Sequence, residues 1–493
     1  MLPLNAQTLA EHAEHVPTPT YDRSVVRTGI AHIGVGGFHR AHLAAYLDAL
    51  MRQGQALEWG ICGIGVLPSD RRMQEALLAQ DGLYTLVVKH ADGTYEPRVI
   101  GSLVHYLFAP DDPEAVLEQL ADPGTRIVSL TVTEGGYNID STTGQFQGDV
   151  PEVRRDLEPG AVPRTVFGLV TEALVRRRDR GVPAFTVLSC DNVQGNGDTA
   201  RSSFAAFAAL RDAELGQWVR TQVSFPNCMV DRITPGTTAE DRAEVASRFG
   251  IEDRWPVVCE PFTQWVLEDA FPLDRPPLQD VGVQLVDDVE PYEFMKLRLL
   301  NASHQALCYF GYLAGYRLVH EVCQDPLFAA FLTAYMDREA TPTLEPVPGV
   351  DLAHYKRELL QRFSNPQVRD TVSRLCAESS DRIPKWLLPV IRHRLAAGGG
   401  IELATAVVAS WARYAEGVDE QGEPIEVVDR LREPLNAAAR RWEQDPLAFL
   451  AQREVFGDLV DEPRFTSAYT AVLTSLHDRG ARTTLEELVA GLR

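Results

Sequence analysis

The sequence has no uninterrupted apolar run near the ~20 residues that a membrane-spanning helix needs, so no segment is expected to cross a bilayer. Residues 1–16 hold no basic stretch followed by an apolar core, so no signal peptide is expected. Positive charge is also scarce: 47 lysines and arginines compare with 69 acidic residues, giving a net charge of −22 and a pI near 5.0. This balance argues against nucleic acid or a membrane surface as a partner.

The sequence also lacks any pattern of cysteines. Seven are scattered at positions 62, 190, 228, 259, 308, 323 and 376, and no two have CxxC spacing. Neither a zinc site nor a disulfide framework is suggested, and there is no internal repeat or low-complexity segment. We expect a cytoplasmic, reduced protein that holds no metal. The apolar content of 45% and charged content of 24% are typical of a globular protein, and 493 residues are enough for two or more domains.

The first half of the chain alternates strand-like and helix-like segments. Short apolar strands are predicted at 29–34, 59–64, 126–132 and 184–189, with helices at 39–53 and 165–180. This alternation is typical of a mostly parallel sheet covered on both faces, which is an α/β fold. Segments 83–90 and 98–107 resemble an inserted pair of antiparallel strands.

The second half has the 3.6-residue periodicity of helices. Helices are predicted at 293–314, 326–336, 352–363, 385–396, 404–414, 427–441 and 465–477. Strand signals almost vanish, so we expect an all-helical C-terminal domain. Three prolines within 272–277 interrupt the pattern, and we place the boundary there, giving domains 1–285 and 286–493.

A glycine-rich turn follows the first predicted strand. In Gly34-Val-Gly36-Gly37-Phe38-His39, the glycines allow a tight turn and close approach to a pyrophosphate, whose charge the following helix N-terminus stabilises. Glycines also serve ordinary tight turns, but a strand before and a helix after favour a dinucleotide. We therefore interpret 1–285 as a Rossmann-like domain. His39 stands where a third glycine or alanine is usual, so its helix should lie farther from the strand or be tilted.

Polar residues follow the other predicted strands. Asp70, after the second strand, can bind the ribose hydroxyls of NAD, while the neighbouring arginines at 71 and 72 can attract a 2′-phosphate. An N-cap for the helix that begins at Arg71 is the alternative for Asp70. Glu134 and Asn192 follow the third and fourth strands, where ligands collect in such sheets, or they close loops. Asp231 and Arg232 are read as a structural pair rather than two independent catalytic groups.

The segment Lys296-Leu-Arg-Leu-Leu-Asn301-Ala-Ser-His304 concentrates polar groups on one apolar helix. At ~100° per residue, Lys296, Asn301 and His304 lie at about 0°, 140° and 80°, with Glu293 near 60°. Burying such a cluster costs stability unless each group is satisfied. A lysine base with an amide and an imidazole that bind the reacting oxygen would suit a cleft handling alcohols and carbonyls. A buried structural network is the alternative, and Lys296 and His304 are ~12 Å apart along the axis.

Several motifs taken in order resemble the polyol-specific long-chain dehydrogenases, a family that includes mannitol 2-dehydrogenases, arabinitol dehydrogenases and fructuronate reductases. The resemblance covers essentially the whole chain. The motifs are Ile33-Gly-Val-Gly-Gly-Phe-His-Arg-Ala-His42, Ser129-Leu-Thr-Val-Thr-Glu-Gly-Gly-Tyr137, Ser189-Cys-Asp-Asn192, Met229-Val-Asp-Arg-Ile-Thr-Pro235, Cys259-Glu-Pro-Phe-Thr-Gln-Trp-Val-Leu-Glu-Asp269 and Lys296…Asn301…His304.

This resemblance implies a zinc-independent, NAD(P)-linked enzyme of two domains. Lys296 would be the general base, with Asn192 and Asn301 stabilising the oxyanion. His304 would orient the substrate, Glu293 would relay the proton to solvent, and Asp231 would help to hold the substrate or the lysine. The expected cofactor contacts are Gly34, Gly36, Gly37, Phe38, Asp70 and Glu134. Arg374 and Arg382 would contact the sugar chain, although the family has lysine at the second position, which leaves the preferred chain length open.

The expected reaction is reversible oxidation of D-mannitol to D-fructose with NAD, NADP serving as a poorer alternative. A lysine that acts as a base at neutral pH needs a pKa below its ordinary value. The alternatives within the family are fructuronate or tagaturonate reduction and arabinitol oxidation. A catalytically inactive dinucleotide sensor is disfavoured because Lys296, Asn192 and Asn301 are all present. We expect a monomer that binds small molecules and neither nucleic acid nor membrane.

Overall fold

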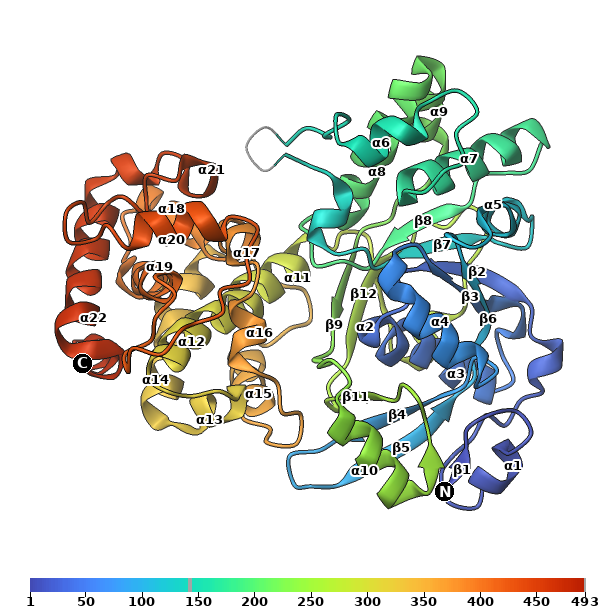
Figure 1. Ribbon diagram of the computed structural model, residues 1–493, viewed down its shortest axis with the longest axis horizontal. Coiled ribbons are helices and arrows are strands. Elements are labelled where there is room, and N and C mark those ends of the chain that lie inside the picture. The colour runs from blue at the N-terminus through green and yellow to red at the C-terminus, as the bar shows by residue number, and fades with distance from the viewer. Residues whose placement is uncertain (141–143, 492–493) are drawn as a thin grey trace. The chain divides into compact units, whose positions relative to one another are not determined.

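The computed structural model describes residues 1–140 and 144–491, and the chain divides into two compact units, Met1–Glu290 and Pro291–Arg493 (Figure 1). We call them the sheet unit and the helical unit. The sheet unit contains parallel strands and the helical unit is built from helices, which confirms the predicted α/β class with a helical C-terminal region. Their division at residue 290 compares with an expected boundary at 285.

The centre of the sheet unit is a five-stranded parallel sheet in the order β6-β3-β2-β7-β8. Its strands are β2 (Thr28–Ile33), β3 (Gly60–Gly65), β6 (Leu103–Phe108), β7 (Ile127–Leu130) and β8 (Thr186–Ser189). Along the chain, β3 and β6 are added on one side of β2, and β7 and β8 are then added on its other side. Ligands bind at such a reversal, beside the carboxyl ends of the strands.

Apolar side chains alternate between the two faces of this sheet, as strand geometry requires. Ile30 and Ile61 pack with α3 (Leu43–Arg52) on one face. Ala31 and Val128 pack on the other face with α5 (Pro113–Ala121), α7 (Val166–Asp179) and α8 (Asn196–Arg211). Burial on both faces explains why these strands read as continuous apolar runs rather than alternating ones.

The helix predicted at 39–53 is broken into α2 (Gly37–Ala41) and α3. The break is at His42, whose φ of −118° and ψ of −94° are not helical. Just before it, the His39 ring stacks on the ring of His32 in β2, with centroids 3.4 Å apart. The His39 ring thus occupies the position of the small residue that usually lets this helix pass close to the strand. The helix is interrupted three residues later, at His42.

The predicted antiparallel pair at 83–90 and 98–107 is half right. β4 (Tyr84–Lys89) pairs antiparallel with β5 (Tyr95–Ile100) and parallel with β11 (Val257–Cys259). The second predicted strand is wrong as one element, because β5 ends at Ile100 and β6 joins the main sheet. Gly101 separates them: its N–H donates to Asp48 Oδ1 at 2.9 Å, and a Cβ there would lie 2.6 Å from Pro19 Cγ.

A further sheet of the same unit has the order β13-β12-β9. Its strands are β9 (Cys228–Asp231), β12 (Gln264–Glu268) and β13 (Gln284–Val286). β9 and β12 are antiparallel, and Asp231 pairs with Gln264 at the end of β9. The short strands β1 (Leu2–Pro3) and β10 (Ile251–Glu252) pair in parallel. The β13-β12-β9 sheet fixes the backbone position of the candidate Asp231.

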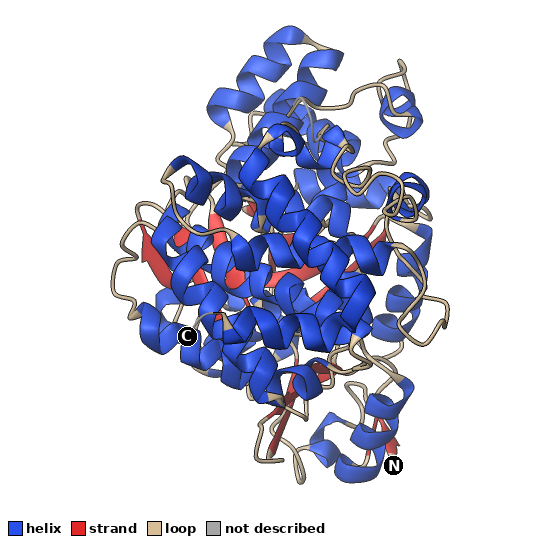
Figure 2. Ribbon diagram, turned by 90° about the vertical axis from the view of Figure 1, so that its left-hand side faces the viewer, coloured by secondary structure: helices blue, strands red, loops and turns tan. Residues whose placement is uncertain are grey.

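The helical unit consists of helices and connecting loops (Figure 2). The bounds are α11 (Glu290–Met295), η6 (Lys296–Asn301), α12 (Ala302–Leu313), α13 (Val319–Gln324), α14 (Pro326–Tyr335), η7 (Met336–Ala340), α15 (Leu352–Phe363), α16 (Val372–Cys376), α17 (Ser379–Trp386), α18 (Leu388–Ala396), α19 (Glu402–Ala415), α20 (Arg432–Ala439), α21 (Arg453–Phe456) and α22 (Pro463–Ala490). The last element, α22, is broken at Gly480, whose φ of +82° and ψ of 168° are not helical. Its first part therefore ends close to the predicted 477, and a further helical segment follows the break. The helix predicted at 427–441 begins only at Arg432.

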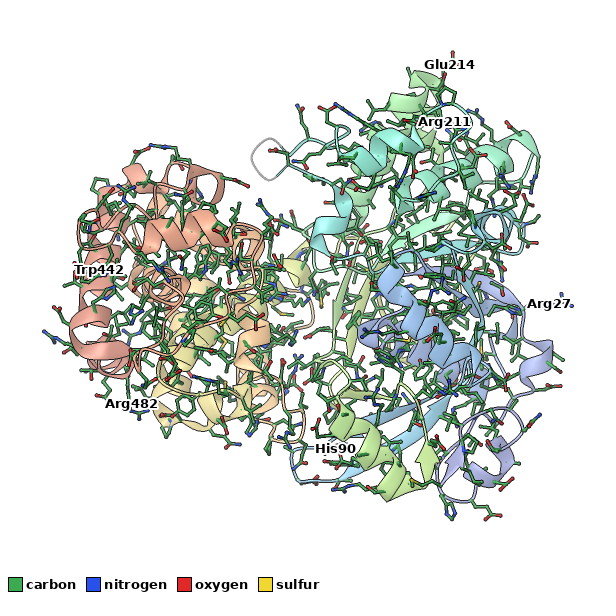
Figure 3. All side chains as sticks on the ribbon, in the orientation of Figure 1. Arg27, His90, Arg211, Glu214, Trp442 and Arg482 are labelled. Atoms are coloured by element: carbon green, nitrogen blue, oxygen red, sulfur yellow. The ribbon has the colours of Figure 1, made fainter. Side chains whose placement is uncertain are left out.

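α12 and α19 form the apolar centre of the helical unit, because almost all their side chains are buried. α22 packs along α19. At one end of that contact His477 Nε2 lies 2.9 Å from Glu416 Oε1 and its ring stacks on Trp442, which is labelled in Figure 3. The central position of α12 means that the polar residues at its N-terminal end belong to a packed interior rather than to a loose surface segment.

Candidate active site

The glycine-rich turn between β2 and α2 has the backbone that a phosphate-binding loop needs. Gly34 has a φ of +94°, and a Cβ there would lie 2.2 Å from the Thr131 carbonyl oxygen, so only glycine fits. A Cβ on Gly36 would meet just one nearby atom, Gly34 O at 3.8 Å, and Gly36 lines a cavity. A side chain at Gly36 would therefore occupy cavity space that a ligand can use.

That cavity, of about 1100 Å³, opens at the carboxyl ends of β2, β3 and β7. Its wall includes two glycines of the turn, the predicted acidic residue and parts of three other loops: Gly34, Gly36, Asp70, Pro110, Thr133 and Arg164. The volume, the glycine-lined wall and the helix N-terminus beside it fit a dinucleotide. Gly37 and Phe38 lie at the start of α2 instead, where the Phe38 ring stacks on that of His42 at 4.8 Å.

Two buried histidines, His32 and His39, pack beside the glycine-rich turn. His32 Nδ1 lies 2.8 Å from Ser129 Oγ and its Nε2 lies 3.0 Å from Thr131 Oγ1, which ties β2 to β7. Burial lowers the pKa of His32 to about 3 and the pKa of His39 well below its ordinary value. Both rings are therefore neutral at physiological pH. The attraction of this turn for a phosphate has to come from its backbone N–H groups.

Asp70 caps the turn that precedes its helix. Its Oδ2 accepts hydrogen bonds from the N–H groups of Val66 and Leu67, each at 2.9 Å. The alternative role as N-cap of α4 (Arg71–Leu78) is not observed, since Asp70 has no side-chain capping bond to that helix. Both of these hydrogen bonds use Oδ2, and Asp70 lines the cavity. The carboxylate is thus held rigidly at the cavity wall.

Asp191 joins the loops after β7 and β8. Its carboxylate accepts hydrogen bonds from Thr133 N at 2.8 Å, from Val132 N at 3.1 Å and from the Tyr137 hydroxyl at 2.7 Å. Thr133 has a φ of +67°, a strained conformation for a non-glycine residue, and these bonds hold it there. Asn192, the next residue, is exposed. The side chain of Glu134 lies outside the described residues.

Asp231 and Arg232 are both buried at the end of β9. The Arg232 guanidinium donates to main-chain oxygens, from Nη1 to Ala41 O at 2.7 Å and from Nε and Nη2 to Glu260 O at 3.2 Å. Arg232 thereby fastens the end of α2 to the segment after β11. This cation serves the backbone of the sheet unit.

In the helical unit, the lysine segment is a π-helix rather than the continuous α-helix expected at 293–314. η6 begins at Lys296 and ends at Asn301. In a π turn the hydrogen bond joins residues i and i+5, so residues five apart lie on the same side. The predicted separation of 140° between Lys296 and Asn301 is therefore wrong, and the two side chains leave the helix in similar directions. π turns are rare and are frequently found at functional sites.

The polar residues around this turn are buried. Exposed fractions are 6% for Glu293, 5% for Lys296, 6% for Asn301 and 7% for His304. The His304 ring packs on Phe363 of α15, with centroids 4.5 Å apart. Asn301 Oδ1 is buried and has no hydrogen-bond partner within residues 1–140 and 144–491. A buried amide oxygen without a hydrogen bond lowers the stability of the fold. A purely structural network would be expected to supply that hydrogen bond.

The helices that carry the two predicted substrate arginines pack on this segment. α16 packs against α12, and α17 packs against both η6 and α12. Arg374 Nε donates to Asp370 Oδ1 at 2.6 Å and its Nη2 pairs with Oδ2, so its charge is balanced. Arg382 Nη1 donates to the main-chain oxygen of Arg374 at 3.2 Å, and its guanidinium lies over the Trp386 ring. The structure thus brings both arginines into one neighbourhood of the helical unit.

Sequence reasoning missed the residues that hold two loops around the cavity. Asp191, which holds the loop of Val132 and Thr133, was recognised only as part of a motif, although its position after a buried strand was an available signal. Arg155 and Arg164 also line the cavity. The buried Asp156 carboxylate holds them together, because it accepts from Arg164 N at 3.0 Å and from the Thr165 N–H and hydroxyl at 2.7 Å. No element was predicted for residues 151–164, so the two arginines could not be assigned to the cavity from the sequence.

Within 1–140 and 144–491, no group of three or more His, Cys, Asp and Glu residues has an arrangement that could hold a metal ion. None of the helices in this part of the chain combines the length and apolar character needed to cross a membrane.

The chain matches two family models along most of its length. Residues 28–280 match the mannitol dehydrogenase Rossmann domain, and residues 288–477 match the mannitol dehydrogenase C-terminal domain. Among curated relatives, mannitol 2-dehydrogenase of Neosartorya fischeri is 45% identical over 99% of both chains. A mannitol dehydrogenase of Saccharomyces cerevisiae is 44% identical over 99% of this chain and 97% of its own.

Two solved structures are also similar. Mannitol 2-dehydrogenase of Pseudomonas fluorescens, solved as a ternary complex with NAD and D-mannitol, superposes with a TM-score of 0.95 at 48% identity, covering 99% of this chain and all of its own. A substrate-free D-sorbitol dehydrogenase gives 0.84 at 36% identity, covering 98% of this chain and all of its own. The glycine-lined cavity, the π turn with its buried lysine and these full-length matches lead to one conclusion: the chain belongs to the mannitol dehydrogenase family.

Proposed function

We propose that this protein is an NAD-dependent oxidoreductase that interconverts D-mannitol and D-fructose. The buried lysine on the π turn, five residues before a buried carboxamide, is the observation that carries the proposal. Support comes from the solved relative that contains NAD and D-mannitol, to which this chain is 48% identical over 99% of its length. The cavity at the glycine turn is large enough for the dinucleotide, and Gly36 leaves the space for it.

The chemistry divides between cofactor and protein. The nicotinamide, when bound, supplies the hydride acceptor for alcohol oxidation and the donor for the reverse reaction. In the protein, Lys296 accepts the proton of the reacting hydroxyl. Only the neutral amine can take a proton, so this role requires a lysine pKa below its ordinary value. Glu293, six per cent exposed on the preceding turn, passes that proton on to solvent.

We assign stabilisation of the developing negative oxygen to two carboxamides. Asn301 presents its amide from the same side of the helix as Lys296, because residues five apart lie on the same side of a π turn. Asn192 follows β8 and is carried by a loop that Asp191 holds rigidly. Hydrogen-bond donors fixed before the reaction stabilise an oxyanion without reorganisation. His304, held by Phe363, orients the substrate, and Asp231 helps to hold the substrate or the lysine.

The substrate class follows from the charges near Arg374 and Arg382. Asp370 already balances Arg374 through two contacts, so this cation is not free for a carboxylate. Arg382 donates to main-chain oxygens, and its Nε has no hydrogen-bond partner in the described parts of the chain. One partly engaged guanidinium suits the hydroxyls of a neutral polyol. A hexuronate reductase, the alternative within the family, requires a cation for its substrate carboxylate.

Three finer assignments complete the proposal. We place the protein in a reducing compartment, the cytoplasm, since all seven of its cysteines are free thiols and buried. Its strongly acidic balance supports small molecules rather than nucleic acid or a membrane surface as partners. We expect a monomer, which sedimentation of the purified protein would test.

The test is a steady-state screen of mannitol, arabinitol, sorbitol, fructose and fructuronate with NAD and with NADP. We expect the highest kcat/KM with mannitol and NAD, and with fructose and NADH in the reverse direction. Fructuronate as the best ketose would transfer the assignment to hexuronate reduction. Arabinitol or sorbitol as the best alcohol would keep the reaction and change the substrate. Inactivity toward all five would overturn the proposal.

A further inference from the structure

The ion pair beside Asp70 is a structural feature that the proposed function leaves unexplained. Arg71, the first residue of α4, donates from Nη2 to Asp111 Oδ1 at 2.5 Å and from Nη1 to Asp111 Oδ2 at 3.1 Å. Its guanidinium carbon lies 4.7 Å from the centroid of the Phe108 ring. Both Nη atoms of Arg71 are therefore engaged by the Asp111 carboxylate, and the Phe108 ring covers one face of the guanidinium.

This pair stands at the rim of the cofactor cavity. Asp70 and Pro110, the chain neighbours of Arg71 and Asp111, both line the cavity wall. Asp70 is the residue whose position suits the adenosine ribose, so a 2′-phosphate on that ribose would be presented toward the same rim. Arg71 is the cation next in sequence to Asp70, and arginine is the side chain that commonly binds a 2′-phosphate.

We infer that Asp111 sets the cofactor preference by holding Arg71 in a two-point ion pair, away from a 2′-phosphate. Its own carboxylate adds a second negative charge near that position. Asp111 is thus a positioning residue that acts through Arg71. The inference rests on the proposed dinucleotide site, and it explains how a chain with an arginine directly after Asp70 can still favour NAD.

The exposure of the pair makes the inference testable without loss of the fold. The side chains of Arg71 and Asp111 are each 48% exposed, and ion pairs with that exposure contribute little to stability. Removing Asp111 should therefore leave the sheet unit folded. It should release Arg71 and remove one repulsive charge at the same time.

The experiment compares Asp111→Asn, which keeps the shape, and Asp111→Ala with the wild type. We expect the ratio of kcat/KM for NADP to kcat/KM for NAD to rise about tenfold, the size expected for one charge–charge term in partly solvated surroundings. The gain should appear in KM for NADP and not in kcat. Direct titration with 2′,5′-ADP should give the same gain in Kd without any turnover, while 5′-ADP should bind as before.

Two further variants separate this role from general effects. Glu433→Gln removes the same charge from an exposed ion pair with Arg432 in the helical unit and should leave the ratio unchanged. Asp111→Asn combined with Arg71→Ala should lose the gain in 2′,5′-ADP affinity, because Arg71 is its source. An unchanged affinity for 2′,5′-ADP in both Asp111 variants would overturn the inference. It would leave the proposed function intact, since that function is tested by wild-type turnover with NAD.

Discussion

The sheet unit and the helical unit use different parts of the polypeptide for their candidate functional residues. In the sheet unit the main chain forms the site: Gly34 and Gly36 give the cavity wall its shape, and the nearby histidines are neutral. In the helical unit the side chains form it, because Lys296, Asn301 and His304 are buried polar groups in an apolar helix. The difference indicates that side-chain truncations should affect catalysis most in the helical unit and cofactor choice most in the sheet unit.

Lys296→Ala gives the most direct test of that contrast. We expect kcat for mannitol oxidation to fall about 10²–10⁴-fold, the usual contribution of a general base, while NADH binds with unchanged affinity. Steady-state kinetics and a fluorescence titration with NADH measure the two effects. Lys356→Ala, which removes an ion-paired lysine of α15, serves as the matched control and should keep wild-type turnover. Near-normal turnover of the Lys296 variant at neutral pH would remove the assignment of the base.

The two carboxamides come from different units and sharpen the comparison. Asn192→Ala and Asn301→Ala should each lower kcat roughly 10²–10³-fold, as loss of one oxyanion donor does. The double variant should lose much less than the product of the two, because both amides are assigned to one oxygen. Asn436→Ala, which removes a carboxamide that donates to Ala415 O and Glu416 O, is the structural control. Fully additive losses would mean that the two residues act at separate places.

The helical unit also buries the carboxyl group of Glu339, and its ionisation should lower the free energy of unfolding. Glu339 in η7 accepts from the N–H groups of Leu403 and Ala404 at the start of α19, at 2.8 and 2.7 Å. Burial raises its pKa to about 7 despite these bonds. Because the folded state then binds the proton more tightly than the unfolded state, the free energy of unfolding should fall by up to about 3 kcal/mol as pH rises from 4.5 to 7.

Thermal unfolding of wild type and Glu339→Gln between pH 4.5 and 8 tests this. The Tm difference, wild type minus variant, should decrease across that interval and level off above pH 7. Glu433→Gln, which removes an exposed carboxylate on α20, should give a constant difference. A constant difference for Glu339→Gln as well would show that the carboxylate is not protonated in the folded protein.

In the sheet unit the expected effects are smaller and concern the cofactor. Asp70→Ala should weaken NAD and improve NADP together, each by about tenfold, because one carboxylate both binds the ribose hydroxyls and repels a 2′-phosphate. The wild type should prefer NAD while still using NADP at a measurable rate. A wild-type kcat/KM for NADP above that for NAD would contradict the role of Asp70 at the ribose.

The smallest expected effect is none. Prolonged dialysis against a chelator should leave activity unchanged, since the sequence offers no zinc-type spacing of cysteines and histidines. Activity assays before and after dialysis, with and without added zinc, measure this. Loss of activity that zinc alone restores would replace the lysine mechanism with a metal-based one.

Local sequence was sufficient for four strands of the central sheet and for the glycine turn. The apolar runs at β2, β3, β7 and β8 and the glycines after β2 have causes within a few residues, namely burial on both faces and the φ of Gly34. Elements whose form depends on distant contacts were not predictable. The break at His42 follows a ring stacked on β2, and the division of 98–107 depends on Asp48 and Pro19.

The π turn is the clearest case of the same limit in the candidate site. The segment Lys296-Leu-Arg-Leu-Leu-Asn301 consists mostly of good α-helix formers, so its composition predicts an ordinary helix. A π turn has weaker local support and persists because surrounding helices hold it. The sequence singles out Lys296, Asn301 and His304 as candidates, whereas the directions of their side chains could not be predicted from it.

The π turn has a practical consequence for protein engineering. A helical wheel drawn from Glu290 through Leu313 with one constant angle loses its phase across Lys296–Asn301, by roughly one residue position or about 100°. Positions in α12 that such a wheel places on the face of Glu293 therefore point elsewhere. A mutant library for substrate range should be drawn on two wheels, one for each side of the π turn.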